Sequence, residues 1–174
     1  MDQAILVFIQ SLNHPVLDIV SEVTSRFVVN GCVWLLVIGT LFLERRRLLH
    51  EAGMAVAAGF VFEVAVVEAV LKPLVARPRP FWLIDDLRVI DGVANNYSFP
   101  SGHVALLTTA GWILSYYFPK TAWLWVVVIG LTAWSRIYNG VHWPSDVLAG
   151  MVVGCLIGYV TLRFLHFMKS KTSL

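Results

Sequence analysis

Long apolar runs separated by short polar breaks dominate the sequence. A helix that crosses a membrane needs roughly 20 mainly apolar residues, and the chain holds several runs of about that length. The runs predict helices at 27–43, 52–71, 101–118, 122–137 and 147–167. We therefore expect one all-α domain over residues 1–174, built as a polytopic membrane helix bundle with about five transmembrane helices.

The first 26 residues follow a different pattern, because polar side chains such as Asp2, Asp18 and Glu22 interrupt the apolar positions. This stretch is too polar for a comfortable membrane crossing. Helices that mix the two kinds of residue often lie in the plane of the membrane surface. We expect one or two interfacial helices here, with a sixth transmembrane helix as the alternative.

Composition supports the membrane assignment and narrows the function. Hydrophobic residues make up 58% of the chain, charged residues make up 14%, and the mean hydropathy is +0.75, which is far from a soluble domain. A net charge of +2 is too small to indicate nucleic acid as a partner. The two cysteines lie singly in apolar runs, without a CxxC spacing or a His-rich neighbourhood, so we expect no metal or other cofactor.

The basic residues predict an orientation, because Lys and Arg in short loops stay preferentially in the cytoplasm. If the loop with Arg45, Arg46 and Arg47 is cytoplasmic, seven of the 13 basic residues lie on that side. The other six then share the outer face with most of the acidic residues. We expect a cytoplasmic carboxyl terminus and a functional face toward the periplasm or cell exterior of a bacterial inner membrane.

A proline-rich stretch follows the second predicted helix and carries Lys72 and Arg79. Proline restricts the backbone, so we expect residues 72–80 to form a stiff, extended arm. Lysine supplies a compact charge, and arginine supplies a planar fork of donors that suits phosphate oxygens. For this stretch alone, anchoring to lipid head groups is an equally good interpretation.

The third predicted helix begins with Ser101, Gly102 and His103. Ser101 suits a helix N-cap, and Gly102 allows a ligand to approach the backbone. The amide groups and the positive end of the helix dipole favour an anion at this point. His103 can donate a proton to a leaving oxygen, although taken alone it fits better as a capping or interfacial histidine.

Another polar stretch joins the fourth and fifth predicted helices and adds a cation, Arg136. Gly140 permits a turn and Pro144 suits the first turn of a helix. His142 and Asp146 then lie four residues apart at a helix start. A carboxylate that holds one ring nitrogen leaves the other nitrogen available as a nucleophile. A purely structural contact explains this pair equally well.

Two glutamates lie inside the second apolar run, where a carboxylate is costly. Glu68 precedes Lys72 by four residues, so the two share a helix face, and we expect Glu68 to pair with Lys72 and set its direction. Glu63 lies deeper and has no evident partner. We expect Glu63 to be a neutral, hydrogen-bonded structural carboxyl, with a proton route as the lesser alternative.

Together the three polar stretches read Lys-x6-Arg-Pro, Pro-Ser-Gly-His and Ser-Arg-x5-His-x3-Asp. This combination, over residues 72–146, resembles the type 2 phosphatidic acid phosphatase (PAP2) superfamily, which also includes vanadium haloperoxidases. The resemblance implies that His142 attacks phosphorus to form a phosphohistidine, that His103 protonates the leaving group and that Asp146 orients the nucleophile. It also implies that no metal is required. The residues that the resemblance assigns to the phosphoryl oxygens are Lys72, Arg79, Ser101, Gly102 and Arg136.

The motifs favour an enzyme that hydrolyses a lipid phosphate or pyrophosphate. Undecaprenyl pyrophosphate ranks narrowly ahead of phosphatidylglycerophosphate and lipid A as the substrate. A haloperoxidase is disfavoured because those relatives are soluble. The non-enzymatic alternative is a transporter or lipid-binding protein that holds an anion without cleaving it, and His142 separates the two because only hydrolysis needs a nucleophile. The sequence leaves the oligomeric state open.

Overall fold

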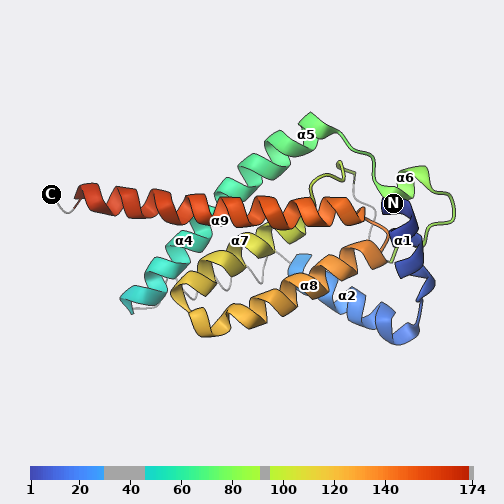
Figure 1. Ribbon diagram of the computed structural model, residues 1–174, viewed down its shortest axis with the longest axis horizontal. Coiled ribbons are helices and arrows are strands. Elements are labelled where there is room, and N and C mark those ends of the chain that lie inside the picture. Colours follow the sequence, from blue (N-terminus) through green and yellow to red (C-terminus); the bar gives the residue numbers. More distant parts are fainter. Residues whose placement is uncertain (30–45, 91–94, 173–174) are drawn as a thin grey trace.

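The computed structural model describes residues 1–29, 46–90 and 95–172, and the regular secondary structure of these residues is helical (Figure 1). The all-α membrane class is confirmed. The predicted helix at 27–43 lies almost entirely outside the described residues. The described elements are α1 (Asp2–Ser11), α2 (Pro15–Val29), α4 (Arg47–Glu63), the π-helix η1 (Val64–Leu71), α5 (Lys72–Val75), α6 (Pro80–Leu83), α7 (Gly102–Tyr117), the 3-10 helix η2 (Pro119–Thr121), α8 (Ala122–Tyr138) and α9 (Pro144–Thr172).

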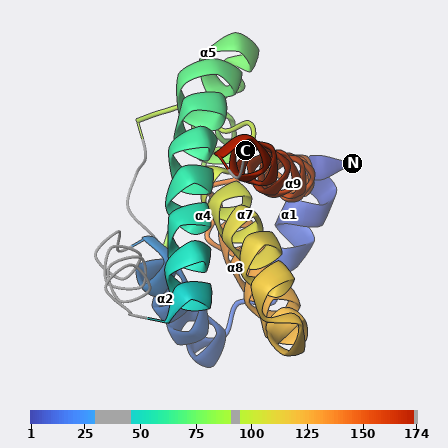
Figure 2. The ribbon, with the colours of Figure 1, turned by 90° about the vertical axis from the view of Figure 1, so that its left-hand side faces the viewer.

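Helix α7 lies at the centre of the bundle. It packs against α4, α8 and α9, and Figure 2 shows it among those three helices. No charged residue occurs from Val104 to Tyr117, and a helix that is apolar on every side is typical of a buried position. Leu107 and Ile113 are almost fully buried. The amino terminus of α7, which carries the Ser-Gly-His motif, is therefore fixed by the helices around it.

Small residues bring α7 and α9 close together. Gly150, Gly154 and Gly158 recur every four residues along α9 and face α7. A Cβ atom built on Gly154 would lie 2.5 Å from the carbonyl oxygen of Ala105 and 2.7 Å from Cβ of Thr108. Without a hydrophobic effect between helices in lipid, such close backbone approach is a main source of helix association.

Three helical segments are long and apolar enough to cross a membrane, namely Arg47–Leu83, Pro119–Tyr138 and Pro144–Lys171. They match the predicted helices at 52–71, 122–137 and 147–167. The predicted helix at 101–118 is present as α7, which has 16 residues.

The amino-terminal pair of helices is also present. Helices α1 and α2 bend by 119° at their junction, and only as one bent pair do they meet the length and composition of a fourth crossing segment. Their placement in the interface stays a prediction.

The helical segment that begins with α4 runs past residue 71, where the second predicted helix ends. It continues through η1 and α5, so Lys72 lies within a helix and the proline-rich stretch is non-helical only over 76–79. The expected extended arm over 72–80 is therefore wrong in its first half. Pro73 lies in the first turn of α5, two residues after the π-helix ends, where a ring that lacks an N–H donor is tolerated. Ala76, with φ of 48°, then ends the helix.

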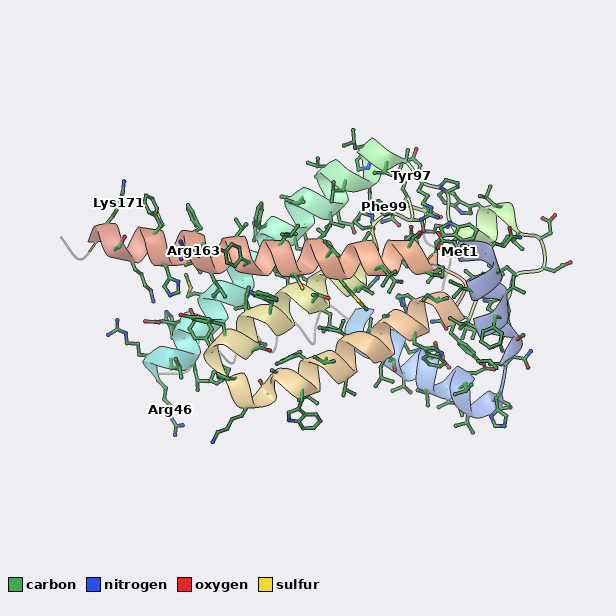
Figure 3. All side chains as sticks on the ribbon, in the orientation of Figure 1. Met1, Arg46, Tyr97, Phe99, Arg163 and Lys171 are labelled. Carbon is green, nitrogen blue, oxygen red and sulfur yellow. The ribbon has the colours of Figure 1, made fainter. Side chains whose placement is uncertain are left out.

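The two ends of the bundle differ in their polar side chains. Figure 3 places the basic residues Arg46, Arg163 and Lys171 toward one end, and Met1 and Tyr97 toward the other. Lys169 at the first end forms an ion pair of 2.7 Å with Glu51 across α9 and α4. The residues of the three motifs gather at the second end.

We predict that Gly154→Ala lowers the melting temperature of the purified protein in detergent. The added methyl group would press on the backbone of α7, and overpacking of this kind costs about 1–3 kcal/mol. The matched control is Gly130→Ala in α8, where no atom lies within 4 Å of the added Cβ. The control should leave the melting temperature unchanged or raise it, because alanine favours the helix. Equal melting temperatures for the two variants would contradict the close packing of α7 on α9.

Candidate active site

The second and third motifs meet where α7 and α9 begin. The backbone N–H of Ser101 donates to the carbonyl oxygen of Asp146 over 3.0 Å. The first motif joins them through Arg79, whose Nη1 donates to the carbonyl oxygen of Val141 over 2.9 Å and lies 3.4 Å from Nε2 of His142. Residues that are more than 60 positions apart in sequence thus share one site.

Lys72 approaches this site from the side of α5. Its ammonium group is buried and lies 2.5 Å from Oε1 of Glu68, so the expected ion pair is present. The other oxygen of Glu68 accepts a hydrogen bond of 3.2 Å from Nδ2 of Asn96. A Cβ atom on Gly102 would lie 2.6 Å from Oε1 of Glu68 and 3.6 Å from Nζ of Lys72. Glycine at this position therefore lets the start of α7 touch the Lys72–Glu68 pair.

The guanidinium group of Arg79 is buried and held from several directions. Its Nε donates to the carbonyl oxygen of Asn96 over 2.8 Å, and its Nη2 donates to Oδ1 of the same residue over 2.6 Å. With Nη1 bound to Val141, the fork has one orientation, beside the ring of His142. An arginine fixed in this way is prepared to hold phosphate oxygens.

The start of α7 differs from the expected side-chain cap. Ser101 takes the N-cap position with an extended backbone, but its side chain makes no cap hydrogen bond. Its hydroxyl oxygen is buried and has no hydrogen-bond partner among the described residues. A buried hydroxyl without a partner is costly, which fits a group that meets a ligand. His103 is half-buried in the first turn of α7.

A tight turn between α8 and α9 places His142. Gly140 has φ of +71°, a conformation that favours glycine, and the N–H groups of Val141 and His142 both donate to the carbonyl oxygen of Arg136 over 3.3 Å. Arg136 is buried, and its Nη2 donates to the hydroxyl of Ser25 in α2.

The pair of His142 and Asp146 is close but is not hydrogen-bonded directly. Nδ1 of His142 lies 3.7 Å from Oδ2 of Asp146, which is longer than a hydrogen bond. The carboxylate is instead held by three donors. Oδ2 accepts from the hydroxyl of Ser98 and from the N–H of Trp143 over 2.9 Å, and Oδ1 accepts from Nη1 of Arg77 over 2.5 Å.

Sequence reasoning missed several of these residues. Ser98 and Asn96 lie in the loop before α7, Arg77 lies between the two cations of the first motif, and Asp2 of α1 binds Arg77 over 2.7 Å. Arg77 lies within the proline-rich stretch over residues 72–80, which carries two residues of the first motif. Its positive charge at that place is a signal that could have identified it. No spacing rule links Ser98, Asn96 or Asp2 to the motifs.

Burial determines the protonation state of His142. The side chain is 2% exposed, and burial lowers the pKa of its imidazole to about 4. The carboxylate of Asp146 opposes this fall in the pKa, whereas the positive charges of Arg79 and Arg136 add to it. The ring is therefore neutral at neutral pH, the state in which an imidazole nitrogen can act as a nucleophile.

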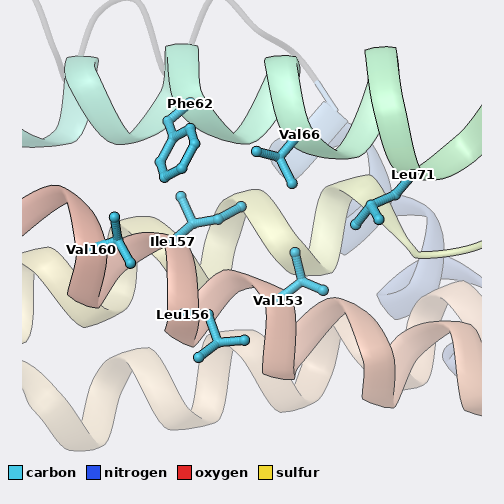
Figure 4. A pocket seen from close by; sticks show the side chains of 7 residues that line it. All are labelled: Phe62, Val66, Leu71, Val153, Leu156, Ile157 and Val160. Carbon is cyan, nitrogen blue, oxygen red and sulfur yellow. The ribbon is translucent and has the colours of Figure 1, made fainter.

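One polar cavity adjoins the site at Lys72, and two apolar cavities lie along α9. A polar cavity of about 490 Å³ is lined by Glu68, Lys72, Pro73, Trp82, Asn95, Asn96 and Tyr97. An apolar cavity of about 300 Å³ lies between η1 and α9, with Phe62, Val66, Leu71, Val153, Leu156, Ile157 and Val160 around it (Figure 4). A further apolar cavity of about 570 Å³ shares Phe62 and Val160 with it. Leu71, which lines the smaller apolar cavity, directly precedes Lys72, which lines the polar one.

Glu63 departs from the expected hydrogen-bonded carboxyl. It is 3% exposed at the end of α4, and its Oε1 has no hydrogen-bond partner among the described residues. The described side chains also contain no group of three or more His, Cys, Asp or Glu residues that could hold a metal ion.

Comparison with known proteins places this site in a family. The model of the PAP2 superfamily matches residues 49–169. An undecaprenyl-diphosphatase of Sulfolobus acidocaldarius is 32% identical over 75% of this chain and 63% of its own length. The bacitracin transport permease protein BcrC of Bacillus licheniformis is 30% identical over 92% of this chain and 78% of its own length. The crystal structure of Aquifex aeolicus LpxE superposes with a TM-score of 0.78 and 25% identity, covering 93% of this chain and 94% of that one.

We predict that the His142 imidazole stays neutral down to about pH 4 in the absence of substrate. Because its pKa is lowered on folding, its contribution to stability is present above about pH 6.5 and is lost as the pH falls toward 4. An NMR titration of histidine-labelled protein in micelles measures this, with His142→Asn identifying the signal. Titration of that signal near pH 6.5 would contradict the burial of the ring.

Proposed function

The chain belongs to the PAP2 superfamily, and on that premise we propose that it is an integral membrane phosphatase that hydrolyses a lipid phosphate or pyrophosphate through a phosphohistidine. Its relatives include enzymes that hydrolyse phosphoric esters. The observation that carries the proposal is the buried ring of His142, which is neutral at neutral pH and whose Nε2 lies 3.4 Å from a cation, Nη1 of Arg79. A nucleophile and a phosphate-binding group then face the same point.

The phosphoryl group is held by residues of all three motifs. Lys72, Arg79 and Arg136 bring positive charge to a group that carries about two negative charges. The buried hydroxyl of Ser101 and the amide of Gly102 at the start of α7 supply neutral donors. Because these groups are already fixed by the fold, they stabilise charge in the transition state without reorganisation.

The reaction proceeds in two displacements. Nε2 of His142 forms a bond to phosphorus as the bond to the leaving oxygen breaks, and His103 gives that oxygen a proton. The carboxylate of Asp146 stabilises the positive charge on the ring. Water then attacks phosphorus and gives its proton to His103, the N–P bond breaks, and inorganic phosphate leaves His142 neutral again.

The cavities fit an amphiphilic substrate. The polar cavity beside Lys72 has room for the rest of a head group, and the apolar cavities between η1 and α9 suit a hydrocarbon chain. Undecaprenyl pyrophosphate ranks first, because a relative carries that activity in its name. Phosphatidylglycerophosphate and lipid A are the alternatives within the same chemistry. The site would face the periplasm or cell exterior from a bacterial inner membrane.

A transporter is the second candidate, because one relative is named a transport permease protein. Such a protein would use Lys72, Arg79 and Arg136 to hold an anion without cleaving it. It would have no need for a neutral histidine beside a buried carboxylate, so the geometry of His142 and Asp146 favours the enzyme.

We predict that the purified protein releases inorganic phosphate from detergent-dispersed lipid phosphates in the presence of EDTA, and that His142→Ala abolishes the release. The variant removes the attacking nitrogen but leaves the three cations. His166→Ala, which changes a histidine far along α9, is the matched control and should keep full activity. Full activity of His142→Ala would rule out the phosphohistidine, and strict dependence on metal would point to a different mechanism.

We also predict that undecaprenyl pyrophosphate gives the highest kcat/KM in a panel with phosphatidylglycerophosphate, phosphatidic acid and lipid A. The panel measures phosphate release under identical detergent conditions. A clear preference for another member would overturn the substrate ranking while leaving the proposed reaction intact.

A further inference from the structure

Arg77 is a half-buried cation outside the three motifs, and its contacts point to Asp146. Its Nη1 donates to Oδ1 of Asp146 over 2.5 Å and to the hydroxyl of Ser145 over 2.7 Å. Its Nη2 donates to Oδ2 of Asp2 over 2.7 Å, and its guanidinium carbon lies 5.4 Å from the centre of the Trp143 ring. Both terminal nitrogens are thus engaged by the protein itself.

This arrangement fixes how the carboxylate of Asp146 is turned. Arg77 holds Oδ1, while Ser98 and the N–H of Trp143 hold Oδ2, the oxygen that lies 3.7 Å from Nδ1 of His142. Asp146 is completely buried, so without a cation its charge would be very poorly solvated. Arg77 therefore both orients the carboxylate and balances part of its charge.

Asp2 completes the arrangement from the amino-terminal helix. One of its oxygens accepts a hydrogen bond of 3.2 Å from the N–H of Ser145, and the other accepts from the hydroxyl of Ser145. A carboxylate at the start of α9 is favoured by the helix dipole. Asp2 and Asp146 therefore share the charge of Arg77, with α1 bound directly to the start of α9.

We propose that Arg77 is a positioning residue of the reaction, which holds the Asp146 carboxylate so that Oδ2 faces the ring of His142. The role rests on the proposed phosphatase function. Arg77 acts on the carboxylate and not on the phosphate, because it binds Oδ1 of Asp146, whereas Oδ2 is the oxygen that lies 3.7 Å from Nδ1 of His142. Its effect is therefore on the chemical step and not on substrate binding.

The test compares Arg77→Gln with Asp2→Asn. Arg77→Gln should lower kcat by about 10²-fold, the size expected when a catalytic group is slightly misplaced, and should leave KM and inhibition by orthovanadate unchanged. Asp2→Asn breaks the contact of Arg77 with α1 but keeps the contact with Asp146, so kcat should fall far less. Arg77→Lys should restore part of the activity, because it keeps one charged donor.

The pH profile separates positioning from a merely structural role. The charged groups that act on the ring of His142 are Asp146 of α9, Arg136 of α8 and Arg79. The titratable residue at the start of α7 is His103. Loss of the Arg77 charge makes Asp146 a stronger partner for a protonated ring, so the acid limb of kcat/KM should move to higher pH in Arg77→Gln. Asp2→Asn removes a negative charge beside Arg77. The acid limb of kcat/KM in this variant should therefore stay in place or move to lower pH.

Several outcomes would overturn the proposal. A raised KM or weaker inhibition by orthovanadate in Arg77→Gln would make Arg77 a phosphate-binding residue. Equal losses of kcat in Arg77→Gln and Asp2→Asn, with unchanged pH profiles, would make it only a link between α1 and α9. If Arg77→Gln does not fold, Arg77→Lys carries the same comparison.

Failure of the proposed phosphatase function is distinguishable from failure of the role of Arg77. The function fails if the wild-type protein releases no phosphate. The inference is then tested by the NMR titration of the His142 ring, which requires no activity. The pKa of that ring should rise in Arg77→Gln and should not rise in Asp2→Asn. A ring that titrates at the same pH in all three proteins would overturn it.

Discussion

The buried charge of Asp146 is the constraint on which the motif-bearing end of the bundle depends. A carboxylate that water cannot reach needs several donors, and here they come from distant segments: Ser98 before α7, Trp143 at the turn after α8, and Arg77 after α5. Each donor fixes the segment that carries it. The ring of His142 is thereby placed beside the carboxylate, and the backbone of Asp146 also anchors Ser101 at the start of α7.

Close packing of α7 on α9 makes this convergence possible. Glycines along α9 allow the two backbones to approach, so the starts of both helices reach the same level of the membrane. The two helix starts carry the Ser-Gly-His motif and the His-Asp pair. The glycines in the interior of the bundle therefore help to place His142 beside the start of α7, and the proposed chemistry depends on this placement.

The sequence predicted the helical class and the residues of the three motifs, because apolar runs and fixed spacings are local signals. It predicted the pair of Glu68 and Lys72 for the same reason, since four residues make one helical turn. It failed where the outcome depended on distant partners. Proline did not force an extended arm at Pro73, because it lies in the first turn of α5, and Ser101 kept its hydroxyl free of the cap bond. The contacts of Arg77 with Asp2 and Asp146 join segments that no pattern relates.

The contact between Asp2 and Ser145 has a consequence for biosynthesis. The two residues are 143 positions apart, so the ribosome makes Asp2 well before it makes Ser145 and the helices between them. Asp2 of α1 therefore cannot form this contact until the start of α9 is in place. A chain interrupted before residue 142 holds Lys72 and Arg79 but lacks both the ring of His142 and the carboxylate of Asp146. The site is thus assembled only when α9 is inserted, which couples the onset of any activity to that step.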